Sequence, residues 1–173
     1  KGKFSVINPN FQDSDKAVSF SVEAIEVDRI AGFGYKNNKV GFSFGTEFEY
    51  LNDLDFSIST SSFYEKIETD NTASAMQKKQ EGNYWDTFLK FGFDFDKRDQ
   101  IFQTSDGFRS RYNLDIPVIS DNNTLTNYFD YKIYKELFDQ NISSAAFMFR
   151  AAKSITNEDI KLSERLFIPS RNL

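Results

Sequence analysis

The sequence contains neither cysteine nor histidine among its 173 residues. Without cysteine it can form no disulfide and no zinc–thiolate centre, and it has no thiol nucleophile. Without histidine it lacks the side chain that most often acts as a general base, so a hydrolase would depend on carboxylates, lysine or tyrosine. We therefore expect no enzyme, no catalytic or metal-binding residues and no cofactor.

Basic residues and long apolar runs are also scarce. Lys and Arg number 21 against 26 Asp and Glu, and the resulting net charge of -5 argues against a nucleic-acid partner, which requires a basic surface. The mean hydropathy is -0.54, and no stretch approaches the roughly 18 apolar residues of a transmembrane helix. The composition does not exclude a transmembrane β-barrel, because the strands of such a barrel alternate apolar and polar residues and contain no long apolar run.

Aromatic residues are abundant, with 20 Phe and 8 Tyr against 3 Pro, and they recur with a period of two. In residues 85–95 the odd positions are mostly apolar, whereas Asp86, Lys90, Gly92 and Asp94 lie between them. Only a strand places successive side chains on opposite faces in this way. The same pattern recurs, more weakly in the third case, in residues 18–24, 42–50, 54–67, 108–116, 129–133 and 145–151.

The predicted strands are about ten residues long, which is the length that crosses a bilayer at the usual tilt. Their connections alternate between short ones, near 51–53 and 137–141, and longer polar ones, near 28–38 and 68–83, where residues 72–80 can form a helical turn. We predict an all-β fold, an antiparallel up-and-down meander of about seven strands after a remnant near residues 4–8. It would be one partial transmembrane β-barrel domain over residues 1–173, truncated at both ends.

The alternation alone fits a soluble β-sandwich equally well, and strand length and Phe content favour the barrel. In a barrel the Phe side meets lipid and the polar side lines the lumen. Candidate lumen-facing residues are Glu47, Glu49, Asp94, Arg109, Arg111 and Asp130. We expect the two arginines to pair with Asp94, Asp96 or Asp130, and we expect Trp85 and Tyr84 to lie in an aromatic girdle at the membrane interface.

Residues 95–117 resemble the BamA-type outer-membrane assembly family, also called the bacterial surface antigen family. In that family a strand ends in Asp-x-Arg-Asp, and a tight periplasmic turn, Phe-x-Pro-Thr-x-Gly, precedes the next strand. The matching residues here are Asp96, Arg98, Asp99, Phe102, Ser105 and Gly107. Thr104 stands where the family usually has Pro, which we expect to loosen the turn. We interpret the charged cluster as a turn held by local ion pairs and not as a catalytic or metal site.

Two flanking segments agree with this resemblance. Residues 6–11 look like the family's Asn-Pro-x-Phe periplasmic turn, and residues 162–169 look like the approach to its long inward-folding loop. The resemblance therefore implies that the chain runs from about the fourth to the eleventh strand of a sixteen-stranded barrel.

The function implied by the resemblance is the folding and insertion of β-barrel proteins into the bacterial outer membrane. The implied partners are unfolded outer-membrane client proteins, assembly lipoproteins and outer-membrane lipid. A two-partner secretion or autotransporter-assembly barrel, a passive porin-like channel and a soluble β-sandwich binding module are the alternatives.

Overall fold

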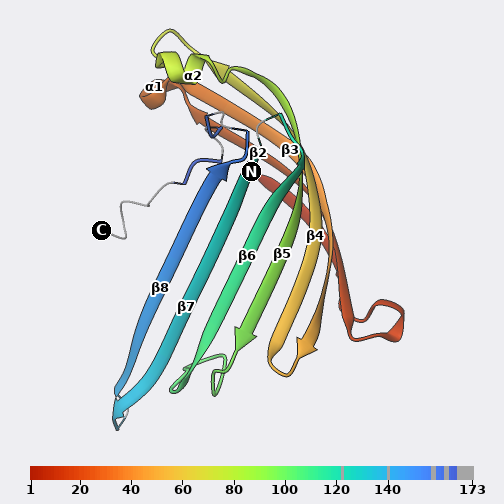
Figure 1. Ribbon diagram of the computed structural model, residues 1–173, viewed down its shortest axis with the longest axis vertical. Coiled ribbons are helices and arrows are strands. Elements are labelled where there is room, and N and C mark those ends of the chain that lie inside the picture. Colours follow the sequence, from red (N-terminus) through yellow and green to blue (C-terminus); the bar gives the residue numbers. More distant parts are fainter. Residues whose placement is uncertain (122, 140, 157–158, 162–163, 167–173) are drawn as a thin grey trace.

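A computed structural model describes residues 1–121, 123–139, 141–156, 159–161 and 164–166 of the chain. Its eight strands form one sheet in sequence order, and each pairs antiparallel with the next (Figure 1). They are β1 (Gly2–Asn8), β2 (Lys16–Arg29), β3 (Tyr35–Leu51), β4 (Leu54–Thr69), β5 (Gly82–Asp96), β6 (Gly107–Ile119), β7 (Thr124–Phe138) and β8 (Asn141–Ser154). The predicted all-β meander with a short leading strand is confirmed, and the sheet is not closed.

Strands β2 to β8 span 13 to 17 residues, longer than the ten that the alternation predicts. The predicted long loop at 28–38 is wrong, because β2 and β3 stay paired up to Arg29 and Tyr35. The sequence pattern ends early for a physical reason. Near this rim both faces carry polar side chains, such as Lys36 and Asn37, so the alternation disappears although the backbone ladder continues.

Three short helical segments lie in the connections: η1 (Phe11–Asp13), α1 (Ile30–Phe33) and α2 (Ala75–Lys78). Helix α2 lies within the predicted helical turn, and the capping box of Ser74 and Gln77 starts it. Helix α1 was not predicted; Gly34, with φ of 73°, ends it. Among the described residues, no helix is long and apolar enough to cross a membrane.

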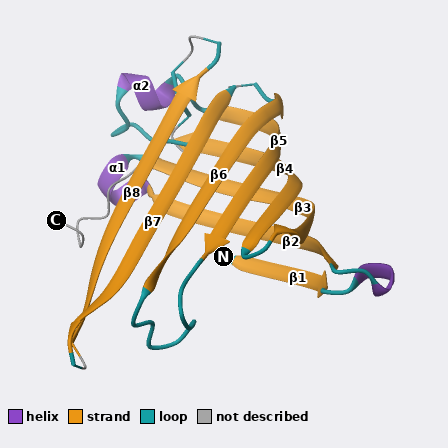
Figure 2. Ribbon diagram, turned by 60° about the horizontal axis from the view of Figure 1, so that its bottom comes forward, coloured by secondary structure: helices purple, strands orange, loops and turns teal. Residues whose placement is uncertain are grey.

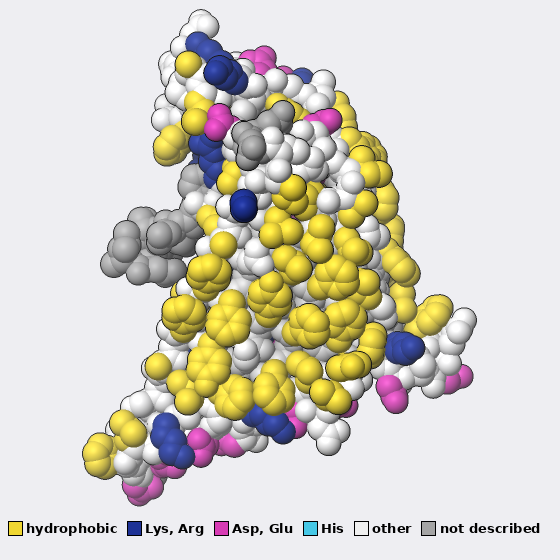
Figure 3. Space-filling model, viewed as in Figure 1, with side chains coloured by type: hydrophobic (Ala, Val, Ile, Leu, Met, Phe, Trp, Pro, Cys, Tyr) yellow, Lys and Arg dark blue, Asp and Glu magenta, His cyan; other side chains and the backbone are white. Residues whose placement is uncertain are grey.

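The strand register assembles the apolar side chains into one continuous face. An aromatic row crosses six neighbouring strands through directly paired residues: Phe48, Phe56, Phe93, Tyr112, Phe129 and Phe149. Within this row the ring of Phe56 contacts both of its neighbours, with centroids 5.6 Å from that of Phe48 and 5.1 Å from that of Phe93. Figure 3 shows the result as a broad apolar band with charged side chains beyond it at both ends. We call this the outer face.

The opposite face, which we call the inner face, lies on the concave side of the sheet (Figure 2). Its small residues match this curvature, since a Cβ added to Gly92 would clash with the Ser57 hydroxyl. Only four apolar residues are buried among those described, namely Tyr35, Ile67, Ala73 and Phe88. The described part of the chain therefore has no second layer that covers the Phe side chains, as a β-sandwich would have.

Candidate functional site

The loop between β5 and β6 holds the motif residues that the sequence singled out. The carboxylate of Asp96, at the end of β5, accepts two hydrogen bonds from the guanidinium of Arg98, with Nε 2.8 Å and Nη2 2.5 Å from its oxygens. The backbone N–H of Arg98 also donates to this carboxylate, 3.2 Å away. Asp96 therefore closes an Asx-type turn with a bidentate ion pair, which fixes how the chain leaves the strand.

Asp99 closes the second half of the same loop. Its carboxylate accepts hydrogen bonds from the backbone N–H of Ser105, at 3.1 and 3.2 Å, and from the Ser105 hydroxyl. These hydrogen bonds lower the pKa of Asp99 below its usual value. Asp96, Arg98, Asp99 and Ser105 thus act together as loop-closing residues, and the part that Ser105 takes was not foreseen from the sequence.

Two details differ from the sequence prediction. The turn is not tight, because residues 97–106 separate the strands. Thr104 does not loosen it: its side chain is buried and its hydroxyl donates to the carbonyl of Gln100, 2.7 Å away. A proline at this position would have no hydroxyl to make this bond.

The remaining motif residues have contrasting roles. Gly107 adopts φ of 98°, and a Cβ at this position would clash with the carbonyl oxygen of Lys97, so only glycine fits. Phe102 is 84% exposed in the loop, next to exposed Ile101. The Asn-Pro-x-Phe segment lies on the same rim, where it joins β1 and β2 through η1.

The predicted lumen-facing residues all lie on the inner face, and its charges pair between adjacent strands. The guanidinium of Arg109 donates to Asp94, with Nε 2.8 Å from the carboxylate, and lies 3.7 Å from Asp96. Arg111 lies 3.8 Å from Asp130, which also pairs with Arg150 at 2.6 Å. The expected pairing of both arginines with these aspartates is confirmed.

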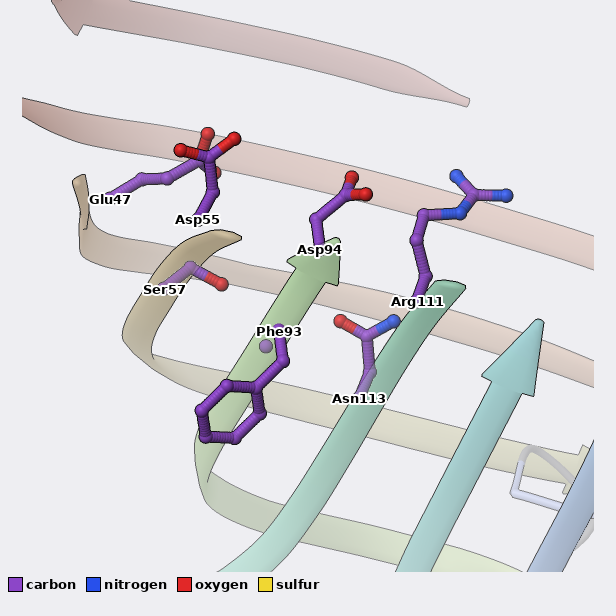
Figure 4. Close-up of a pocket in the computed structure, with 8 residues that line it drawn as sticks. Glu47, Asp55, Ser57, Phe93, Asp94, Arg111 and Asn113 are labelled. Carbon is purple, nitrogen blue, oxygen red and sulfur yellow. The ribbon is translucent and has the colours of Figure 1, made fainter. Parts of the chain in front are cut away.

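Like charges also face each other on this wall. The strand register places Glu49 directly opposite Asp55, and Asp55 directly opposite Asp94. Such pairs destabilise a sheet unless water or a cation screens them. Asp55 and Asp94 line a cavity of about 230 Å³ together with Glu47 and Arg111 (Figure 4). The arrangement suits a water-filled lumen.

Among the described residues, the most deeply buried ionic group is one that the sequence pattern did not predict. Lys161 follows β8, is fully buried, and forms ion pairs with Glu65 on β4, 3.0 Å away, and with Asp86 on β5. A third carboxylate, that of Glu164, lies 3.7 Å from the ammonium group. Burial opposes the charge of Lys161, but these carboxylates outweigh it and raise the pKa of Lys161; burial raises the pKa of Glu164.

The carboxylates that receive Lys161 are held by other polar groups. The side-chain amide of Asn37 donates to Glu65 over 2.6 Å, and the hydroxyl of Ser120 donates to Asp86 over 2.5 Å. The ring of Tyr84 lies 4.8 Å from the ammonium group. Tyr84 therefore faces inward, which makes its place in the predicted girdle wrong, whereas Trp85 is exposed on the outer face.

No residue-level signal in the sequence indicated this cluster. Glu65 and Asp86 lie on the polar faces of their strands, so nothing distinguished them from the other residues of those faces. The segment at 162–169 was expected to begin an inward-folding loop. Residues 162, 163 and 167–169 lie outside the described residues, and Lys161 and Glu164 do lie against the inner face.

A curved meander with an aromatic, uncovered outer face and a charged inner face defines the wall of a transmembrane β-barrel. The comparison with protein families gives the particular family. The chain matches the model described as the Omp85 superfamily domain over residues 1–172, and it belongs to this superfamily. The superfamily is one of outer-membrane β-barrels and covers BamA, TamA and two-partner secretion transporters. A comparison with curated proteins finds no match for the chain.

Proposed function

We propose that the chain is part of a BamA-type factor that folds and inserts β-barrel proteins into the bacterial outer membrane. The observation that carries this proposal is the loop between β5 and β6. Its signature residues resemble those of the BamA-type family. Four of them close the loop through the Arg98–Asp96 ion pair and the Ser105–Asp99 hydrogen bonds. The geometry supports a structural role for the signature, and membership of the Omp85 superfamily supports the membrane setting.

The proposed partners follow from this function. Unfolded outer-membrane proteins would be the clients, assembly lipoproteins would be accessory partners, and outer-membrane lipid would contact the aromatic row of the outer face. We propose no bond-making or bond-breaking step. Clients would instead be assembled by strand pairing at a sheet edge, which uses backbone hydrogen bonds.

The test is a reconstitution of the full-length protein in phospholipid vesicles. A urea-unfolded β-barrel client is added, and its folding is followed by its heat-modifiable gel mobility. We expect the client to fold faster than in empty vesicles. Vesicles that contain an equal amount of an unrelated, correctly folded porin serve as the control. Equal client folding rates in the two vesicle types, with the full-length protein itself folded, would refute the proposal.

A passive channel is the second candidate, and the charged inner face favours it. The cavity lined by Glu47, Asp94 and Arg111 has the polar character of a porin lumen. Steady, high conductance of the full-length protein in planar bilayers, without any acceleration of client folding, would support the channel. Release of one dedicated partner across the vesicle membrane would instead indicate two-partner secretion.

A further inference from the structure

The segment that follows β8 contacts the inner face and two rim loops at once. The backbone N–H of Ile155 donates to the carbonyl of Asn123, in the loop between β6 and β7, over 2.8 Å. The side-chain amide of Gln80 donates to the carbonyl of Ile160 over 3.2 Å, and Gln80 belongs to the loop 70–81 that carries α2. These contacts link connections that are far apart in sequence.

Lys161 is the strongest anchor of this segment. It is fully buried, and its two strand partners, Glu65 and Asp86, come from neighbouring strands and are each held by a further hydrogen-bond donor. The inner face therefore presents a preoriented acceptor for one ammonium group. The backbone next to Lys161 is Ile160, whose carbonyl is the group that Gln80 contacts, so the anchor and the loop contact are one residue apart.

The chemistry of the anchor indicates a reversible contact. A buried ion pair often contributes no more to stability than apolar side chains of the same volume, because both charges lose their hydration on burial. Two contacts of the segment with loop 70–81 are polar: the side-chain amide of Gln80 donates to the carbonyl of Ile160, and the guanidinium of Arg165 lies 3.3 Å from the sulfur of Met76. Such contacts can be exchanged for lumen water without exposure of a hydrophobic core.

We propose that Lys161 is a positioning residue that couples the inner face of the sheet to the rim loop carrying α2. With Lys161 seated between Glu65 and Asp86, Ile160 holds Gln80 and loop 70–81 is ordered. With Lys161 released, the loop loses this support and opens more often. The coupling holds for an assembly factor and for a channel, so it does not depend on the proposed function.

The test uses the full-length protein in lipid nanodiscs and compares Lys161→Met with Lys3→Met. Lys3 is an exposed lysine on β1, so its variant makes the same chemical change away from the anchor. Hydrogen exchange of residues 70–81 is measured by mass spectrometry. We expect about tenfold faster exchange in Lys161→Met and no change in Lys3→Met, since the loop contact opens only in the first.

A second measurement keeps the proposal open to refutation if Lys161→Met does not fold. The chain has no cysteine, so Gln80→Cys with Ile160→Cys creates a unique pair for a short bifunctional maleimide. We expect efficient cross-linking with Lys161 present and a clear loss in Asp86→Asn, which removes one of the two strand carboxylates. Absence of cross-linking with Lys161 present, or unchanged exchange of residues 70–81 in a folded variant that has lost the cross-link, would overturn the coupling.

Discussion

The depth of Leu89 in the bilayer gives the sharpest test of the outer face. Leu89 lies seven residues from each end of β5. At a rise of roughly 3.3 Å per residue, each half of the strand spans about 23 Å. A tilt of about 45° reduces this to about 16 Å along the membrane normal, which is half of the roughly 30 Å hydrocarbon core. Leu89 therefore lies near the midplane, and Phe95 lies about 14 Å from it, at the interface.

Leu89 and Phe95 are each replaced by arginine and, separately, by alanine. The unfolding free energies of the two variants at one position are compared, so that the loss of the native side chain is common to both. Arginine on a lipid face costs about 2–4 kcal/mol at the midplane and about 0–1 kcal/mol near the interface. We therefore expect Leu89→Arg to be at least about 2 kcal/mol less stable than Leu89→Ala, and Phe95→Arg to differ from Phe95→Ala by at most about 1 kcal/mol. Asn113→Arg, on the exposed inner face, should cost little.

The assay is equilibrium unfolding in guanidinium chloride of the full-length barrel in phospholipid vesicles. An equal cost of arginine at Leu89 and Phe95 would contradict this placement of the lipid face. So would an inner-face variant, Asn113→Arg, that loses as much stability as Leu89→Arg. In either case the aromatic row would have to face protein and not lipid.

Three further predictions concern the loop and the buried cluster. Lys161→Met should lower the unfolding free energy by about 3–5 kcal/mol, because it leaves two buried carboxylates without their cation. Lys3→Met, at an exposed position on β1, should change it by less than about 0.5 kcal/mol in the same denaturant titration. Gly107→Ala should cost about 1–3 kcal/mol from its positive φ alone, and more from the clash with a carbonyl oxygen of the same loop, which thermal unfolding monitored by circular dichroism would reveal. The hydrogen bonds from Ser105 lower the pKa of Asp99, so their contribution to stability is present above the usual carboxyl pKa, near 3.9, and is lost as the pH falls through the lowered value. We therefore expect the local opening of residues 97–106, measured by hydrogen exchange, to increase as the pH falls through this range. Asp99→Asn should remove the increase, and a pH dependence that persists in the variant would contradict the assignment.

The alternation of residues 85–95 was enough to predict a strand with an apolar and a polar face, and the same pattern predicted the meander. The loop signature from Asp96 to Gly107 was also recognisable, because its roles are local: Arg98 closes on Asp96 two residues away, and Ser105 closes on Asp99 six residues away. The strand ends were not predictable, since both faces become polar outside the apolar band and the period of two disappears.

The buried cluster lay beyond sequence reasoning for a different reason. Lys161 contacts Asp86 on β5, 75 residues earlier in the sequence, and Glu65 on the preceding strand, β4. Both contacts depend on the register of β4 against β5, because a slip of one residue would turn every side chain of a strand to the other face. By itself the sequence determined the two faces, the meander and the local closure of the loop, because each follows from near neighbours. Only the tertiary structure decided which charges pair across the inner face, because register and curvature bring distant residues together.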